Sequence, residues 1–186
     1  MTKWIAPAAA LMLPVLAGLA GPALAQEDAT CHVNARYHVS AVSNTESVGT
    51  VFTITEKKSR GAALPCPVAA EDADRVVGDG DTAYWFEALA EDYLVLTEST
   101  GPEGSVVVVE LATGDKVLDV PAYYEFTNPD GVTYWERQEE GTRDNCPQFD
   151  EYDANGMGKV ISHETVFDFA TGTAKPTGQT RCDATQ

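Results

Sequence analysis

Residues 106–119, VVVVELATGDKVLD, carry the strongest fold signal in the chain. The four valines make the segment apolar on both faces, which predicts a strand in the middle of a sheet, covered on both sides. The run ends in Ala-Thr-Gly, and Gly114 stands where a tight loop needs a residue at positive φ. Residues 106–119 therefore predict a buried strand, a hairpin corner closed by a glycine bulge, and the start of the next strand.

A second copy of this corner follows 58 residues after the first, at residues 165–178, TVFDFATGTAKPTG. Gly172 takes the place of Gly114, and Asp168 takes the place of Glu110. In both copies we expect the carboxylate to accept hydrogen bonds from backbone N–H groups of the turn. The motif resembles the strand–turn–strand of a β-propeller blade, but its spacing does not fit blade periods of roughly 40 to 50 residues. The repeat therefore predicts two hairpin corners.

The rest of the chain reads as strands and turns. Residues 32–42 alternate apolar and polar side chains and are expected to form one strand, with residues 44–49 as the turn into a second strand that begins at Thr50. Pro-Asp-Gly at 129–131 marks a further hairpin turn, and residues 68–81 predict either a short helical turn or a loop. The predicted fold class is all-β, an antiparallel sandwich or small barrel of about eight to ten strands.

The four cysteines predict two disulfide bonds, because their number is even and the N-terminus indicates an oxidising compartment. Four cysteines allow three different pairings. We expect Cys31–Cys66 and Cys146–Cys182, since each pair brackets a predicted hairpin whose ends lie close together. A zinc site is the weaker hypothesis, because the chain has no C-x-x-C pair and the spacings are long.

Residues 1–25 have the features of a cleaved signal peptide. Lys3 supplies a positive start, an apolar run follows, and Ala-Leu-Ala at 23–25 matches the small-x-small pattern before a signal peptidase site. This pattern predicts a single exported β domain at residues 26–186, located in the periplasm or secreted. Two prolines interrupt the apolar run, so no membrane insertion is expected after cleavage.

The chain is strongly acidic, with 29 Asp and Glu against 12 Lys and Arg and a formal charge of −17. Cleavage after residue 25 also removes Lys3, which leaves 11 basic residues and a formal charge of −18. A field of this sign repels nucleic-acid phosphates and anionic lipids, so nucleic-acid binding is excluded. A basic protein or a cation is a favourable partner, and acidity that serves solubility alone is the alternative.

Neither a nucleophile elbow of the G-x-S-x-G type nor a Gly-rich phosphate loop occurs in the sequence. The protein is therefore expected not to be an enzyme and to need no cofactor. Residues 151–156, EYDANG, resemble the start of an EF-hand calcium loop, with Glu151, Asp153 and Asn155 as oxygen ligands. Ser162 stands where that loop needs its bidentate glutamate, so a plain acidic turn is preferred over this weak metal-site hypothesis.

Binding is the predicted function. We expect an inhibitor or accessory protein that acts on a basic envelope-associated protein such as lysozyme, because bacterial lysozyme inhibitors share this size, export signal, β-structure and disulfide content. The loop at residues 97–105, TESTGPEGS, is the expected contact, through Thr100 and Ser105. The alternatives are a glycan-binding module that uses the aromatics Trp85 and Trp135, or an enzyme of unidentified reaction. Each tryptophan follows a tyrosine, so one ring of each pair faces outward unless both faces of the strand are covered.

Overall fold

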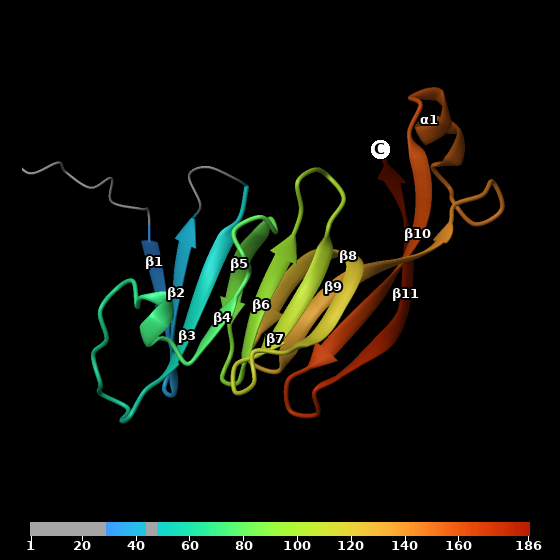
Figure 1. Ribbon diagram of the computed structural model, residues 1–186. Coiled ribbons are helices and arrows are strands. Elements are labelled where there is room, and N and C mark those ends of the chain that lie inside the picture. The colour runs from blue at the N-terminus through green and yellow to red at the C-terminus, as the bar shows by residue number, and fades with distance from the viewer. Residues whose placement is uncertain (1–28, 44–47) are drawn as a thin grey trace, which may run out of the picture.

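The protein is nearly all β in this computed structural model, which describes residues 29–43 and 48–186. The predicted signal peptide, and residues 44–47 of the expected turn at 44–49, lie outside the described residues. Every strand pairing in the described part of the chain is antiparallel, and the strands form one sheet of four and one of seven (Figure 1). The predicted all-β antiparallel fold class is confirmed.

The four-stranded sheet has the order β1-β2-β3-β4, and the seven-stranded sheet has the order β11-β10-β9-β8-β7-β6-β5. The described residues thus form eleven strands, against the about eight to ten expected for a sandwich or small barrel. They also contain a 3₁₀ turn, η1 (Ala70–Asp72), and one short helix, α1 (Phe149–Ala154). The strands are β1 (Ala29–Val33), β2 (Tyr37–Ser43), β3 (Thr50–Glu56), β4 (Arg75–Val77), β5 (Tyr84–Leu89), β6 (Tyr93–Glu98), β7 (Ser105–Glu110), β8 (Lys116–Asn128), β9 (Gly131–Glu140), β10 (Gly158–Asp168) and β11 (Thr173–Thr185).

The prediction of a single strand at residues 32–42 is wrong, because a hairpin turn divides this segment. β1 ends at Val33 and β2 begins at Tyr37. Asn34 makes the turn: its Oδ1 accepts hydrogen bonds from the backbone N–H groups of Arg36 and Tyr37, at 2.9 and 2.7 Å, as asparagine side chains do in turns. Val33, an apolar position in that alternation, is exposed because the turn shifts the phase of the alternation.

One face of the β5–β7 region packs against the four-stranded sheet and forms the first core. The buried side chains come from β2, β3 and β4 on one side and from β5, β6 and β7 on the other. Burial of an aliphatic or aromatic side chain contributes about 1.5 to 3 kcal/mol each, so this interface joins the two sheets firmly. The first core contains Tyr37, Val39, Ala41, Phe52, Ile54, Val77, Tyr84, Leu94, Leu96, Val107, Val109 and Leu111.

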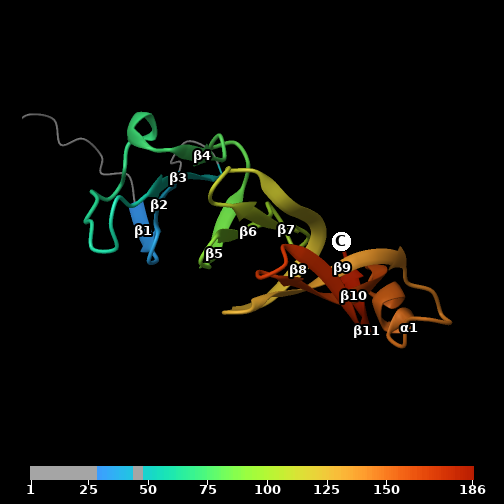
Figure 2. The same ribbon diagram turned by 90° about the horizontal axis from the view of Figure 1, so that it is seen from below.

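The opposite face of β6 and β7 forms a second core with β8, β9 and β10. Figure 2 shows β5–β7 between the four-stranded sheet and β9–β11. Val106 and Val108 belong to the second core, whereas Val107 and Val109 belong to the first. All four valines have no exposed surface, which confirms the prediction of a central strand covered on both faces. The second core contains Val95, Val106, Val108, Ala122, Val132, Tyr134 and Phe167.

Strand β8 connects the two parts of the seven-stranded sheet. Its first half pairs with β7 as far as Pro121, which lies opposite Ser105, and its second half pairs with β9 from Ala122, which lies opposite Glu136. The change of partner strand, from β7 to β9, falls at Pro121, which has no N–H to donate to a sheet. The strand can therefore bend there, so that β9 and β10 come to cover the second face of β6 and β7.

Both repeated corners have the predicted geometry at their glycines. Gly114 and Gly172 have φ angles of 81° and 62°. Their N–H groups donate to the carbonyls of Glu110 and Asp168, at 2.8 and 2.9 Å. The Asp168 carboxylate accepts from two backbone N–H groups of its turn, as predicted. The Glu110 carboxylate instead accepts from the Thr113 hydroxyl at 2.9 Å, because its longer side chain reaches past the backbone.

The predicted disulfide pairing is confirmed. Cys31 joins Cys66, which ties β1 to the loop after β3, and Cys146 joins Cys182, which ties the segment before α1 to β11. Across residues 68–81, where a helical turn or a loop was expected, the chain forms η1 and then β4. Among the described residues no helix has the length and apolar character that crossing a membrane requires.

Candidate functional site

The loop predicted as a contact site connects β6 to β7 and borders a shallow hollow of about 430 Å³. We call this the acidic hollow and define it by Asp81, Glu98, Thr100, Glu103, Ser105 and Arg137. Thr100 lies exposed in the loop, and Ser105 is the half-buried first residue of β7. The structure thus brings together both predicted hydroxyl residues and adds three carboxylates. Asp81 comes from the β4–β5 connection, so sequence reasoning did not assign it to this site.

Hydrogen bonds hold the β6–β7 loop in one shape. The Ser99 hydroxyl donates to carbonyls within the loop, and the Trp85 indole N–H donates to the Ser99 carbonyl at 3.0 Å. The Gly104 carbonyl accepts from the Ala122 backbone N–H at 3.1 Å and from Arg137 Nη2 at 2.8 Å. The backbone of the loop is therefore anchored from β5, β8 and β9.

The charges of the acidic hollow are mainly negative. Arg137 is the one basic residue among the described residues that line it. Its guanidinium lies 5.0 Å from the centre of the Tyr123 ring and donates to the Gly104 carbonyl. Beside the hollow, Asp79 accepts hydrogen bonds from the N–H groups of Thr82 and Asp81, which lower the pKa of its carboxyl group. Asp79 therefore keeps its negative charge into acidic solution.

The two predicted tryptophans do not form a common surface. Trp85 is 47% exposed, whereas Trp135 is 9% exposed and lies under the Arg181 guanidinium at 4.3 Å. Trp85 pairs with Thr97, and Thr97 pairs with Val106 of the second core. Residues directly opposite each other project from the same face of a sheet, so Trp85 lies on the face that carries the second core. Trp135 follows Tyr134, a residue of the second core, and so projects from the other face of the sheet. A glycan platform built from both rings is therefore not present.

The residues of the EF-hand-like segment lie in and after α1. Glu151 and Asp153 are in the helix and Asn155 follows it. Asp153 pairs with Lys159 at 2.5 Å, and this contact lowers the pKa of the Asp153 carboxyl group. Asn155 Nδ2 donates to the Glu151 carbonyl at 2.8 Å. The segment is thus a helical turn held by its own contacts, and the described residues contain no group of three His, Cys, Asp or Glu side chains placed to hold a metal.

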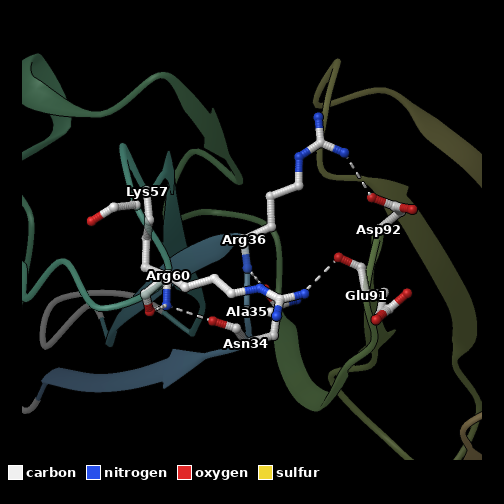
Figure 3. Close-up of a pocket in the computed structure, with 8 residues that line it drawn as sticks. Asn34, Ala35, Arg36, Lys57, Arg60, Glu91 and Asp92 are labelled. Carbon is white, nitrogen blue, oxygen red and sulfur yellow. Dashed lines mark hydrogen bonds and ion pairs between the residues drawn. The ribbon is translucent and has the colours of Figure 1, made fainter.

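A basic pocket of about 380 Å³ lies between the β1–β2 turn and the β5–β6 turn, and it was not predicted. Figure 3 shows the Arg36 side chain reaching Asp92, at 3.2 Å. Lys57 Nζ donates to the Asn34 carbonyl at 2.6 Å and to the Arg60 carbonyl at 3.3 Å. Arg36 and Lys57 thus hold neighbouring turns together. The signal that could have located this pocket is the dense basic stretch KKSR at residues 57–60 in an acidic chain.

A wider groove of about 680 Å³ lies on the other side of the β5–β6 turn. We call it the ring groove and define it by Glu91, Tyr93, Thr127, Asn128 and Phe169. The rings of Tyr93 and Phe169 are stacked, with centres 5.4 Å apart and planes 18° apart. These residues come from the β5–β6 turn and the first residue of β6, from the end of β8, and from the β10–β11 turn, so no local sequence pattern joins them. The ring groove and the acidic hollow lie at opposite ends of β6.

Comparison of the chain with protein-family models, with curated proteins and with solved structures found no match.

Proposed function

We propose that the protein is an exported, non-catalytic binding protein whose partner is a basic protein that docks at the acidic hollow. The observation that carries this proposal is the set of three carboxylates, Asp81, Glu98 and Glu103, around a loop fixed by hydrogen bonds. A partner's lysine or arginine side chain fits such a site, because a cation placed among carboxylates gains charge-assisted hydrogen bonds.

The overall charge supports the same kind of partner. The chain has a formal charge of −17, and a field of this sign accelerates the approach of a cationic protein. Local groups then supply the fit: the hydroxyls of Thr100 and Ser105 can accept hydrogen bonds from a guanidinium or ammonium group. Long-range attraction brings the partner close, and the hollow selects among basic surfaces.

Binding without catalysis is proposed because of the kinds of side chains that line the hollow. The described residues of its lining include carboxylates, hydroxyls and one arginine, with no histidine or cysteine among them. Arg137 is held by the Gly104 carbonyl and the Tyr123 ring. This set suits recognition of a cation better than general acid–base or nucleophilic chemistry.

Export to the periplasm or the cell exterior is part of the proposal. It is supported by the signal features of residues 1–25 and by two disulfide bonds, which persist in oxidising compartments. A protein of the cell envelope or its surroundings is therefore the expected partner, and lysozyme is the first probe.

The test is binding of the cleaved chain to lysozyme, measured by titration calorimetry at low and at physiological ionic strength. We expect affinity to fall as salt rises, and Glu98→Gln with Glu103→Gln to weaken binding by about tenfold or more. The matched control is Glu71→Gln with Asp72→Asn, two exposed carboxylates of η1 that do not line the hollow. Equal loss in both double variants would mean that charge alone attracts lysozyme, and the hollow would be rejected as the docking site.

A further inference from the structure

We propose that the ring groove is a second binding site and that its ligand is a neutral saccharide. The groove lies at the end of β6 opposite the acidic hollow, and the two sites share no residue. Its volume of about 680 Å³ lies within the range of about 300 to 1,000 Å³ that is typical of small-molecule sites. The proposal therefore stands independently of the basic partner.

The rings supply the apolar part of the site. Tyr93 and Phe169 both line the groove and both remain half-buried. Phe167 lies behind them with its ring centre 5.5 Å from that of Tyr93 and 6.1 Å from that of Phe169. Phe167 is 1% exposed, so the stack rests on the second core. The exposed parts of aromatic rings held in this way can contact ligands that are apolar on one side and polar at their edges, such as the rings of sugars.

The rim supplies polar groups held in place by the turn. Asn128 Oδ1 accepts from the N–H groups of Asp130 and Gly131, at 2.8 and 3.0 Å. This fixes the amide, and within the described residues its Nδ2 donates no hydrogen bond and is available to a ligand. The Thr127 hydroxyl oxygen accepts from Tyr124 at 3.2 Å and keeps its own proton to donate. Glu91 is exposed at the rim and offers acceptor oxygens. Donors and acceptors beside a ring face match the hydroxyls of a saccharide.

The negative charges around the groove favour neutral saccharides over anionic ones. Glu91 and Asp92 both line the groove. Arg36 contacts Asp92 at 3.2 Å and is shared with Glu56 at 3.0 Å, and the ion pairs of the described residues do not include Glu91. The Glu91 carboxylate therefore adds negative charge at the rim of the groove, in a chain with a formal charge of −17. Uronic acids and phosphorylated sugars are repelled, whereas neutral rings are not.

The experiment is calorimetric titration of the full chain with cellotetraose, chitotetraose and mannotetraose, and with the anionic tetragalacturonate. We expect at least one neutral tetrasaccharide to bind with a Kd near or below about 1 mM and tetragalacturonate to bind about tenfold more weakly or not at all. Phe169→Leu keeps an apolar side chain but removes a ring, so it should weaken binding about threefold to tenfold. Glu91→Ala changes an exposed side chain, poses no folding problem, and should weaken binding about threefold.

Two controls separate this site from the acidic hollow. Glu98→Gln with Glu103→Gln should leave saccharide affinity unchanged, and Phe169→Leu should leave lysozyme affinity unchanged. Failure of all three neutral tetrasaccharides to bind would overturn the proposal. Equal affinity in the original chain, in Phe169→Leu and in Glu91→Ala would overturn it as well, and so would preferential binding of tetragalacturonate.

Discussion

Gly172 lies against Tyr93: a Cβ atom on Gly172 would stand 3.1 Å from the Tyr93 hydroxyl oxygen. The other repeated corner reaches the same part of the chain, because the Leu111 N–H donates to the Asp92 carbonyl at 2.9 Å. Both Ala-Thr-Gly corners therefore contact residues 92–93, where the β5–β6 turn leads into β6. The two copies of the repeat therefore pack at the same end of the molecule, next to the ring groove.

Because of this contact, substitution of Gly172 should destabilise the protein more than substitution of Gly114. Gly114→Val and Gly172→Val should each lower the free energy of unfolding by about 1 to 3 kcal/mol, because a β-branched residue resists positive φ. Gly172→Val should be the more harmful of the two, since its side chain also meets Tyr93, whereas a Cβ at Gly114 meets only flexible Arg75 at 3.4 Å. Urea unfolding measures both changes.

Gly61→Val is the matched control for this comparison. A Cβ at Gly61 meets nothing within 4 Å, and Gly61 is not among the glycines at positive φ. Its stability should change little. If Gly61→Val destabilises the protein as much as Gly172→Val, the conformation of the corners is not what determines the loss.

The two disulfide bonds should stabilise the protein by similar amounts. They close loops with sequence separations of 35 and 36 residues, for which the chain-entropy relation gives about 4 kcal/mol each. Replacing either pair by serines should therefore lower the unfolding free energy by comparable amounts, measured in urea without reductant. A difference above about 2 kcal/mol between the two double variants would show that native-state contacts, rather than loop closure, dominate one of them.

Stability should fall as the pH is lowered through the histidine range. Burial lowers the pKa of His32 and of His38 from the ordinary value of 6.5, and Lys57 lowers that of His38 further. Below that value the unfolded chain binds protons that the folded chain excludes, so the unfolding free energy decreases as the pH falls. Urea titrations between about pH 8 and pH 5 measure this slope. His32→Gln with His38→Gln should flatten it, and an unchanged slope in that variant would contradict the assignment.

Patterns of consecutive residues in the sequence predicted those parts of the fold that depend on neighbours along the chain. The valines of β7 and the glycines of both corners were located because each follows from alternation or from turn chemistry in a few consecutive positions. The turn at Asn34 was missed because alternation continues past it while the side chain of Asn34 supplies the turn. The sequence left open which of the two tryptophans is buried, because Arg181, 46 positions after Trp135 in the chain, covers the Trp135 ring.

The residues of the candidate sites also fall into two groups: some are close in the sequence, and others are brought together only by the fold. Thr100 and Ser105 were predicted because one loop contains both. Asp81 joins them only through the packing of the β4–β5 connection beside that loop. The ring groove could not be predicted, since Tyr93 and Phe169 are placed side by side by the bend of β8, which folds β9 and β10 over β6 and β7.

The hydroxyls of the acidic hollow give the sharpest test of specific docking, because their removal leaves the charge unchanged. Thr100→Ala with Ser105→Ala should weaken lysozyme binding about threefold to tenfold, since each hydroxyl accepts from the bound cation. Thr30→Ala with Thr180→Ala removes two exposed hydroxyls on β1 and β11 and should have no effect. Both double variants keep the field that attracts cations, so long-range attraction and its salt dependence should be identical in all three chains. A loss confined to Thr100→Ala with Ser105→Ala therefore reports contact at the hollow. If that variant binds lysozyme as tightly as the original chain, the partner is held by the net charge and the β6–β7 loop does not recognise it.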